Sequence, residues 1–139
     1  MRRVFGLRGA TKVLNDEADI VSQLAVLYDA MLAENNICED DIISLIFSIT
    51  DDITVKNPAA ALRQSGRAGE LTLFSVQEPK TAGSPAGIIR ILLHCYMDEG
   101  QKPSHVYRNG AEILRPDWAE HKDAKPDLYK NIPIKVVDL

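Results

Sequence analysis

The stretch that decides the fold is Ile88-Ile89-Arg90-Ile91-Leu92-Leu93-His94-Cys95-Tyr96-Met97. Its apolar residues follow the turn-like composition of residues 79–87, and together these features predict a long apolar strand. Arg90 interrupts the apolar run. An ionised side chain in such a strand is costly unless it is paired or serves a ligand. We therefore predict that this strand carries part of a functional site.

Segments on either side of this strand alternate between predicted strands and helices. Residues 3–11, 42–50 and 71–76 are predicted strands. From about residue 16 to residue 36, apolar side chains recur at helical spacing, and Asn15 or Asp16 is a suitable N-cap. Pro58 suits the first position of a short helix over residues 58–64, which Asn57 would cap. This order predicts an α/β (α+β) fold.

The C-terminal part of the chain contains a strong hairpin signal. Asn109-Gly110 is typical of a two-residue β-turn, so residues 106–107 and 111–114 are predicted to flank a hairpin. After Pro116 the chain is charged, and it ends in an apolar run over residues 132–137 that predicts an edge strand.

Bulk composition narrows the possible functions. The chain has 139 residues, of which 45% are hydrophobic, so one domain with its own core is expected. A net charge of -4 argues against general binding to nucleic acid or to an anionic membrane. Cys38 and Cys95 form neither a metal-ligand spacing nor a disulfide framework. We expect a cytoplasmic protein without a metal ion or cofactor.

Several charged or phenolic residues lie in or beside the apolar runs, namely Arg8, Glu78, Arg90, Tyr107 and Arg115. Arginines that converge with one glutamate and one tyrosine predict a site for a small, multiply charged anion rather than for a nucleophile. Simpler interpretations exist for each residue. Arg8 and Arg115 could face water, Arg90 could form a purely structural pair with Glu78, and Tyr107 could serve packing alone.

The motifs also occur in an order that resembles a known family. They are GLRGAT over residues 6–11, Pro58-Ala59-x-Ala61-x-Arg63, SVQE over 75–78, IIRILLH over 88–94, HVYRNGA over 105–111 and LRPD over 114–117. From about Arg3 to Asp117 the chain resembles the monofunctional chorismate mutases of the Bacillus type (AroH class). The resemblance implies a mixed sheet packed by helices, assembled as a homotrimer with a pseudo-barrel centre. It also implies active sites in clefts between neighbouring subunits.

This resemblance implies the Claisen rearrangement of chorismate to prephenate, a step of aromatic amino-acid biosynthesis. The reaction is intramolecular and needs a protein that selects a compact dianion and stabilises separating charge. By resemblance, Arg90 lies at the ether oxygen, and Glu78 faces the ring hydroxyl and the developing positive charge. Arg8 and Tyr107 would bind carboxylates, and Arg63 and Arg115 would lie at the mouth of the cleft. The implied substrate-binding residues are Arg8, Asn57, Ala59, Arg63, Phe74, Ser75, Tyr107, Leu114 and Arg115. The domain would span residues 1–118, and a C-terminal tail, residues 119–139, would be mobile or would pack over the cleft.

Three positions depart from the family pattern, which usually has an aromatic residue at Asn57, a lysine at Ala60 and a cysteine at Ser75. The first two changes remove an apolar wall and a positive charge, so we expect weaker substrate binding with little effect on the chemistry. Two alternatives stay open. The chain could be a non-catalytic, regulatory trimer that binds a small anion, or an imine deaminase of the Rid type, which also places an arginine in an inter-subunit cleft.

Overall fold

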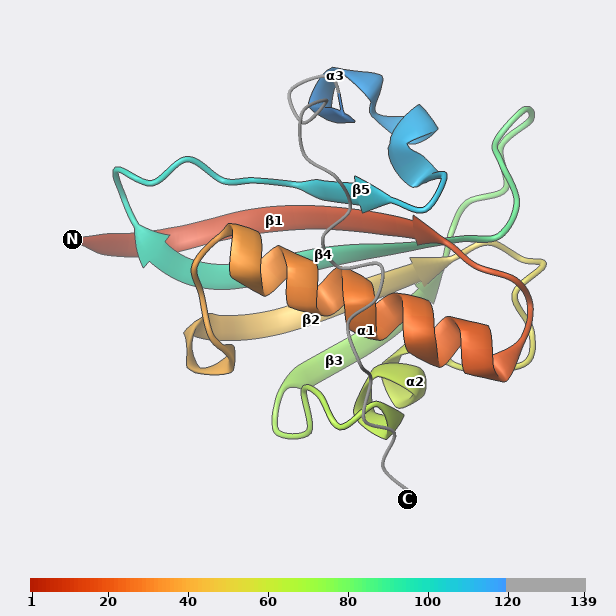
Figure 1. Ribbon diagram of the computed structural model, residues 1–139, viewed down its shortest axis with the longest axis horizontal. Helices are drawn as coiled ribbons and strands as arrows, with labels where there is room; N and C mark the ends of the chain where they lie inside the picture. Colours follow the sequence, from red (N-terminus) through yellow and green to blue (C-terminus); the bar gives the residue numbers. More distant parts are fainter. Residues whose placement is uncertain (120–139) are drawn as a thin grey trace.

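A five-stranded sheet with its two longest helices on one face forms the structure, a computed structural model in which residues 1–119 are described (Figure 1). The elements in chain order are β1 (Arg2–Lys12), α1 (Glu17–Glu34), η1 (Glu39–Asp41), β2 (Ile42–Ile49), α2 (Pro58–Gln64), β3 (Thr72–Gln77), β4 (Ile88–Asp98), β5 (Val106–Arg108), η2 (Ala111–Leu114) and α3 (Pro116–Ala119). None of the helices in the described part of the chain is long and apolar enough to cross a membrane.

The sheet is mixed, with the strand order β3-β2-β4-β1-β5. The central strand β4 is antiparallel to both of its neighbours, β1 and β2. The outer pairs, β1 with β5 and β2 with β3, are parallel. Both helices predicted before β4 are present, and α2 has the predicted bounds. The α+β fold with a mixed sheet is therefore confirmed.

Helix α1 begins and packs as its sequence indicates. The Asp16 side chain accepts a hydrogen bond from the Asp19 backbone N–H at 3.0 Å and so caps the first turn. The apolar side of the helix is buried against the sheet, with Ile20, Leu24 and Leu27 fully inaccessible to solvent. In Figure 1, α1 lies across the middle strands, so this face of the sheet is covered.

Strand β4 alternates between two environments. Side chains at every second position are buried in the main core beneath α1, namely Ile89, Ile91, Leu93, Cys95 and Met97. The intervening side chains, Arg90, Leu92, His94 and Tyr96, point to the opposite side, which we call the open face. The strand was predicted as one long apolar run, and the alternation places its arginine on the open face rather than in the core.

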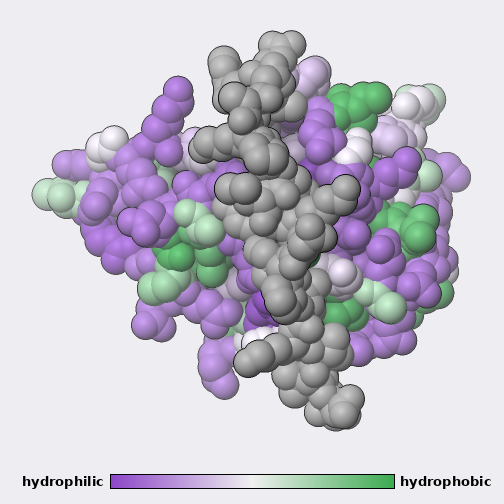
Figure 2. Space-filling model, viewed as in Figure 1, coloured by the Kyte–Doolittle hydropathy of each residue, from purple (hydrophilic) through white to green (hydrophobic). Residues whose placement is uncertain are grey.

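Much of the open face is apolar, and no described helix longer than one turn covers it. Large apolar side chains that lie there with between 36% and 65% of their surface exposed are Val4, Phe74, Val76, Leu92 and Tyr96. By contrast, hydrophilic residues predominate on the described surface of the side that carries α1 (Figure 2). The exposed apolar area is therefore concentrated on the open face.

The predicted hairpin at Asn109-Gly110 is wrong, although the turn itself is present. Both residues have positive φ angles, 54° and 97°, as a tight turn requires. The Asn109 side chain donates a hydrogen bond to the Lys12 carbonyl at 2.7 Å, which fastens the turn to the end of β1. Strand β5 already pairs in parallel with β1, and residues 111–114 form the 3₁₀ helix η2 instead of a returning strand. The strand predicted over residues 132–137, and the tail beyond residue 119, lie outside the described residues.

Replacing Gly9 by alanine is expected to destabilise the fold, because β1 and α1 approach closely there. A Cβ at this position would lie 2.5 Å from the Met31 sulfur and 3.2 Å from Leu27 Cδ1. Both side chains are fully buried, so the expected cost is about 1–3 kcal/mol of the free energy of unfolding. Urea denaturation measures it, with Gly69→Ala as the control because nothing lies within 4 Å of a Cβ there. A Gly9→Ala protein as stable as the wild type would contradict this packing.

Candidate anion-binding site

Arg90 and Glu78 form an ion pair at one end of the sheet. Arg90 lies on the open face of β4, and Glu78 directly follows β3, where its backbone N–H donates to the Ile49 carbonyl at 2.8 Å. The Arg90 Nη1 atom contacts Glu78 Oε1, and the exposed fractions of the two side chains are only 27% and 22%. The Arg90 Nε–H is buried and has no hydrogen-bond partner among the described residues. The carboxylate therefore holds the guanidinium and leaves one of its donors available.

Tyr107 lies in the same row of the sheet as Arg90. The β-register pairs Arg90 with Ala10, and Ala10 with Tyr107, so the two large side chains flank one small residue on the open face. The Tyr107 hydroxyl is buried without a hydrogen-bond partner in the described part of the chain. Burial raises the pKa of this phenol, although the nearby positive charges of Arg8, Arg90 and Arg115 oppose the shift. Tyr107 is thus a neutral hydroxyl donor near three cations.

Two further arginines extend this cationic surface. Arg8 is exposed and lies two residues before Ala10 on the same face of β1, and its backbone N–H donates to His105 Nδ1 at 3.0 Å. Arg115 follows η2 and forms a forked pair with Asp117, with Nε–O and Nη2–O distances of 3.0 and 2.7 Å. Leu114 packs against a small apolar cluster that contains Tyr107. Arg8, Glu78, Arg90, Tyr107, Leu114 and Arg115, which we call the arginine group, therefore lie in one region of the structure.

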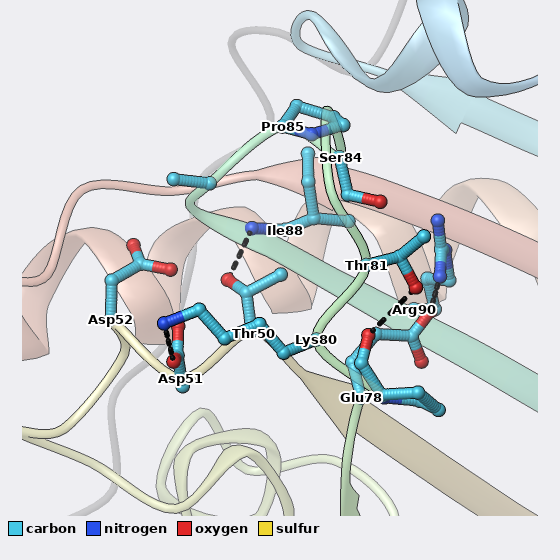
Figure 3. Close-up of a pocket in the computed structure, with 12 residues that line it drawn as sticks. Thr50, Asp51, Asp52, Glu78, Lys80, Thr81, Ser84, Pro85, Ile88 and Arg90 are labelled. Carbon is cyan, nitrogen blue, oxygen red and sulfur yellow. Dashed lines mark hydrogen bonds and ion pairs between the residues drawn. The ribbon is translucent and has the colours of Figure 1, made fainter.

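A pocket of about 440 Å³ opens beside the Arg90–Glu78 pair (Figure 3). Residues 50–52 at the end of β2 and the loop over residues 79–86 form its other walls. In Figure 3, Glu78 and Arg90 lie at one end of this pocket, and Asp51, Asp52 and Lys80 lie at the other. Arg8, Tyr107 and Arg115 do not line the pocket.

The electrostatics of the pocket indicate where an anion would bind. A hydrogen bond from the Thr50 hydroxyl, with a weaker one from the Gly87 backbone, lowers the pKa of Asp52, so this carboxylate is charged. Asp51 is paired with the exposed Lys80 at 3.2 Å, so that cation is already neutralised. A dianion is therefore repelled from the far end of the pocket and is attracted to the side of Arg90 that faces Tyr107.

The remaining predicted site residues do not join the arginine group. Asn57 caps α2 by accepting a hydrogen bond from the Ala59 N–H at 2.9 Å, and the Ser75 hydroxyl donates to the same Asn57 oxygen at 3.0 Å. Ser75 pairs in register with the fully buried Phe47, which places it on the helix face of the sheet, opposite Arg90.

Residues around α2 form a second set, the α2 group, which consists of Asn57, Ala59, Arg63, Phe74 and Ser75. Arg63 is exposed near the end of α2, whereas Ala59 is buried in its first turn. Phe74 has 65% of its surface exposed and lies on the open face of β3. Within one chain, Asn57 and Ser75 lie on the helix face of the sheet, away from the arginine group, whereas Phe74 shares the open face with it.

Trp118 is a site residue that sequence reasoning missed. Its ring lies beside Arg8, Tyr107, His105 and Arg115. His105 stacks on the indole and accepts a hydrogen bond from the Arg8 backbone N–H. The available signal was that Trp118 is the only tryptophan of the chain and directly follows the LRPD motif.

Comparison with known proteins identifies the class to which this sheet and its arginine-lined site belong. Residues 4–118 match the sequence family described as chorismate mutase type I, an isomerase family. The match spans most of the chain, so the chain belongs to the type I chorismate mutases.

Individual relatives agree with this assignment. Chorismate mutase AroH of Thermus thermophilus is 36% identical over 117 residues, which cover 82% of this chain and 95% of the relative. Chorismate mutase AroH of Bacillus subtilis is 29% identical over 124 residues, which cover 88% of this chain and 98% of the relative. The solved structure of a chorismate mutase from Clostridium thermocellum superposes with a TM-score of 0.74 and 38% identity, covering 79% of this chain and 99% of that one.

The Tyr107 phenol is expected to ionise only above about pH 10, the ordinary value, because burial outweighs the three cations. The unfolded chain ionises at that ordinary value. Raising the pH above it therefore favours unfolding, and Tyr107 contributes to the loss of stability. Ultraviolet difference titration of wild type against Tyr107→Phe isolates this phenol. A difference signal that titrates at or below pH 10 would mean that the arginine charges dominate.

Proposed function

We propose that this protein is a chorismate mutase that converts chorismate to prephenate in aromatic amino-acid biosynthesis. One observation carries the proposal, namely that the Arg90 Nε–H and the Tyr107 hydroxyl are both buried on the same row of the sheet, without a hydrogen-bond partner among residues 1–119. A buried donor without an acceptor costs about 1–3 kcal/mol, so such donors are expected to serve a ligand. Carboxylate and ether oxygens are acceptors, and chorismate offers both.

The reacting groups follow from the chemistry of the rearrangement. As the ether bond breaks, its oxygen gains negative charge and the ring gains positive charge. Arg90, with an unused donor, is assigned to the ether oxygen, and Glu78 to the developing positive charge. Because the ion pair exists before the substrate binds, little reorganisation is required during the reaction. No proton transfer or covalent intermediate is needed.

The carboxylates of the substrate are assigned to the remaining donors of the arginine group. Arg8 and Tyr107 bind them directly, and Arg115 lies at the mouth of the site. A phenol that stays neutral is suited to this role, because an ionised phenolate would repel the dianion. The permanently charged guanidinium groups supply the attraction that a chain of net charge -4 lacks elsewhere.

A complete site is proposed to form between subunits of a homotrimer. Asn57 and Ser75 of one chain lie on the opposite face of the sheet from their own arginine group, so a neighbouring chain would supply the α2 group. The apolar side chains of the open face support this assembly, because burial of the row formed by Leu92, Ile46 and Phe74 would stabilise it. The family resemblance supports the same arrangement, with these faces lining a pseudo-barrel centre.

Neither alternative suggested by the sequence finds support in the comparisons. The matched family and the relatives described above are chorismate mutases, not imine deaminases or regulatory anion-binding proteins. The cytoplasmic location stays a prediction. Asn57 and Ser75 bond to each other, so their polar atoms are less available to a substrate, and this supports the expectation of weak ground-state binding.

Replacing Arg90 by lysine is expected to lower kcat for chorismate on the order of 10²–10³-fold, because lysine keeps the charge but loses the preorganised fork at the ether oxygen. The fall in near-ultraviolet absorbance of chorismate measures the rate. Arg3→Lys is the matched control, since Arg3 lies over Phe5, away from the site. Near wild-type turnover by Arg90→Lys would refute the assigned role, and wild-type protein without turnover would refute the function.

Mixing two inactive variants is expected to restore activity if sites are shared between subunits. Arg90→Ala disables the arginine group, and Arg63→Ala disables the α2 group. Hybrid trimers reassembled from equal amounts should contain about a quarter of intact sites, since each site draws on two chains. Turnover of the mixture, compared with that of each variant alone, measures this. A mixture that stays inactive while light scattering shows hybrid trimers would exclude shared sites.

A further inference from the structure

We propose that Trp118 is a positioning residue for substrate binding, which holds Arg8, Arg115 and Tyr107 in the arrangement that receives the carboxylates. The kinetic part of this inference rests on the proposed function, whereas the geometric part does not.

Four charged or aromatic side chains of the described residues lie around the Trp118 indole. The guanidinium carbon of Arg115 lies 3.4 Å from the centre of the ring, and that of Arg8 lies at 5.6 Å. The Tyr107 ring meets the indole edge to face, with a centroid distance of 5.4 Å and an interplanar angle of 73°. His105 stacks on it at 4.1 Å and 26°. Three of these four residues were assigned to the substrate from other observations.

The contacts with the arginines are of the cation–π type. A guanidinium within about 6 Å of a tryptophan ring is attracted by the negative charge of the ring face. For Arg115, the forked pair with Asp117 fixes the plane of the guanidinium, and the indole fixes its position above the ring. Arg8 has no carboxylate partner among the described residues, so the indole is the charge-attracting group near its side chain. Both arginines would otherwise lose considerable rotamer freedom when the substrate binds.

Trp118 is itself anchored to the sheet. It packs against a small apolar cluster on the open-face side of β1, whose buried members are Ala10, Ile88, Tyr107 and Ala111. His105, which stacks on the indole, accepts a hydrogen bond from the Arg8 backbone at 3.0 Å. The indole therefore connects α3 with β1 and β5, the two strands that supply Arg8 and Tyr107.

A purely structural tryptophan would have a different effect on kinetics. Loss of packing lowers stability but leaves the Michaelis constant of the folded fraction unchanged. Loss of positioning weakens carboxylate binding in both the ground state and the transition state, so it raises KM and changes kcat little. A phenyl ring keeps part of the cation–π and edge-to-face contacts, so a phenylalanine variant should recover most of the binding.

The first experiment needs no ligand. Because Trp118 is the only tryptophan, fluorescence excited at the red edge of the absorption band, where the four tyrosines do not absorb, reports on this ring alone. Arg115→Ala should expose the indole face, shift its emission to longer wavelength and raise quenching by acrylamide about twofold. Arg3→Ala, which removes an arginine over a different ring, should change neither property. Identical spectra for wild type and Arg115→Ala would overturn the proposed stacking.

The second experiment measures KM and kcat for chorismate at a temperature where thermal melts show each variant to be folded. Trp118→Ala should raise KM about three- to tenfold with kcat within about twofold, and Trp118→Phe should raise KM by less than about threefold. Ile113→Ala, at a 75% exposed position in the adjacent η2, is the control and should match the wild type. A folded Trp118→Ala protein with wild-type KM would refute the positioning role. Wild-type protein without turnover would instead refute the proposed function and leave the fluorescence result as the test of the geometry.

Discussion

Strand β4 must bury apolar side chains on one face of the sheet while it presents Arg90 on the other, and the rest of the structure depends on this alternation. Its register against β1 and β2 buries Ile89, Ile91 and Leu93 under α1. A shift by one residue would bring Arg90 into that core and would expose the isoleucines, at a cost of several kcal/mol for the charge alone. The hydrophobic core therefore determines on which face of the sheet Arg90 lies and opposite which residues of the neighbouring strands it is placed. The position of this candidate site residue follows from packing on the opposite side of the strand.

The Arg90–Glu78 pair is better explained by function than by stability. A half-buried ion pair gains little net free energy, because desolvation offsets most of the attraction between the charges. It also leaves the Arg90 Nε–H without a partner in the described part of the chain, whereas a purely structural arginine would be expected to have all its buried donors paired. The acidic far end of the pocket adds to this interpretation, because it leaves the side facing Tyr107 as the favourable place for an anion.

Local sequence signals predicted the elements that depend on local interactions. Helix α1 is specified by the cap at Asp16 and by the helical spacing of its apolar side chains. Helix α2 is specified by Asn57-Pro58 at its start. The Asn109-Gly110 signal predicted the turn correctly but not the element after it. Strand β5 pairs with β1, which is distant in sequence. No local pattern encodes that pairing. The chain direction after the turn is consequently set by tertiary packing.

Prediction of the site was limited in the same way, because local sequence patterns do not encode contacts between distant segments. Residue types and motif order pointed to Arg8, Arg90, Arg115, Glu78 and Tyr107, which the structure brings into one region, because an ionised group next to an apolar run is unusual in itself. Trp118 was missed because an isolated tryptophan in a polar segment carries no pattern, and its meaning comes only from the four side chains around it. The separation of Ser75 from Arg90 was also not predictable, since it depends on the register of β3 against β2.

The division of the site between two faces of one sheet has a thermodynamic consequence for the proposed trimer. A ligand that contacts the arginine group of one chain and the α2 group of the next binds the assembly and not the separate chains. By linkage, such a ligand stabilises the trimer by RT ln(1 + [L]/Kd) for each site, and assembly in turn raises the affinity for the ligand. The apolar open face then has two roles, because its burial drives association and association completes the site. Changes at Phe74 or Leu92 would therefore affect substrate binding through assembly, although Leu92 lies outside the residues assigned to the substrate.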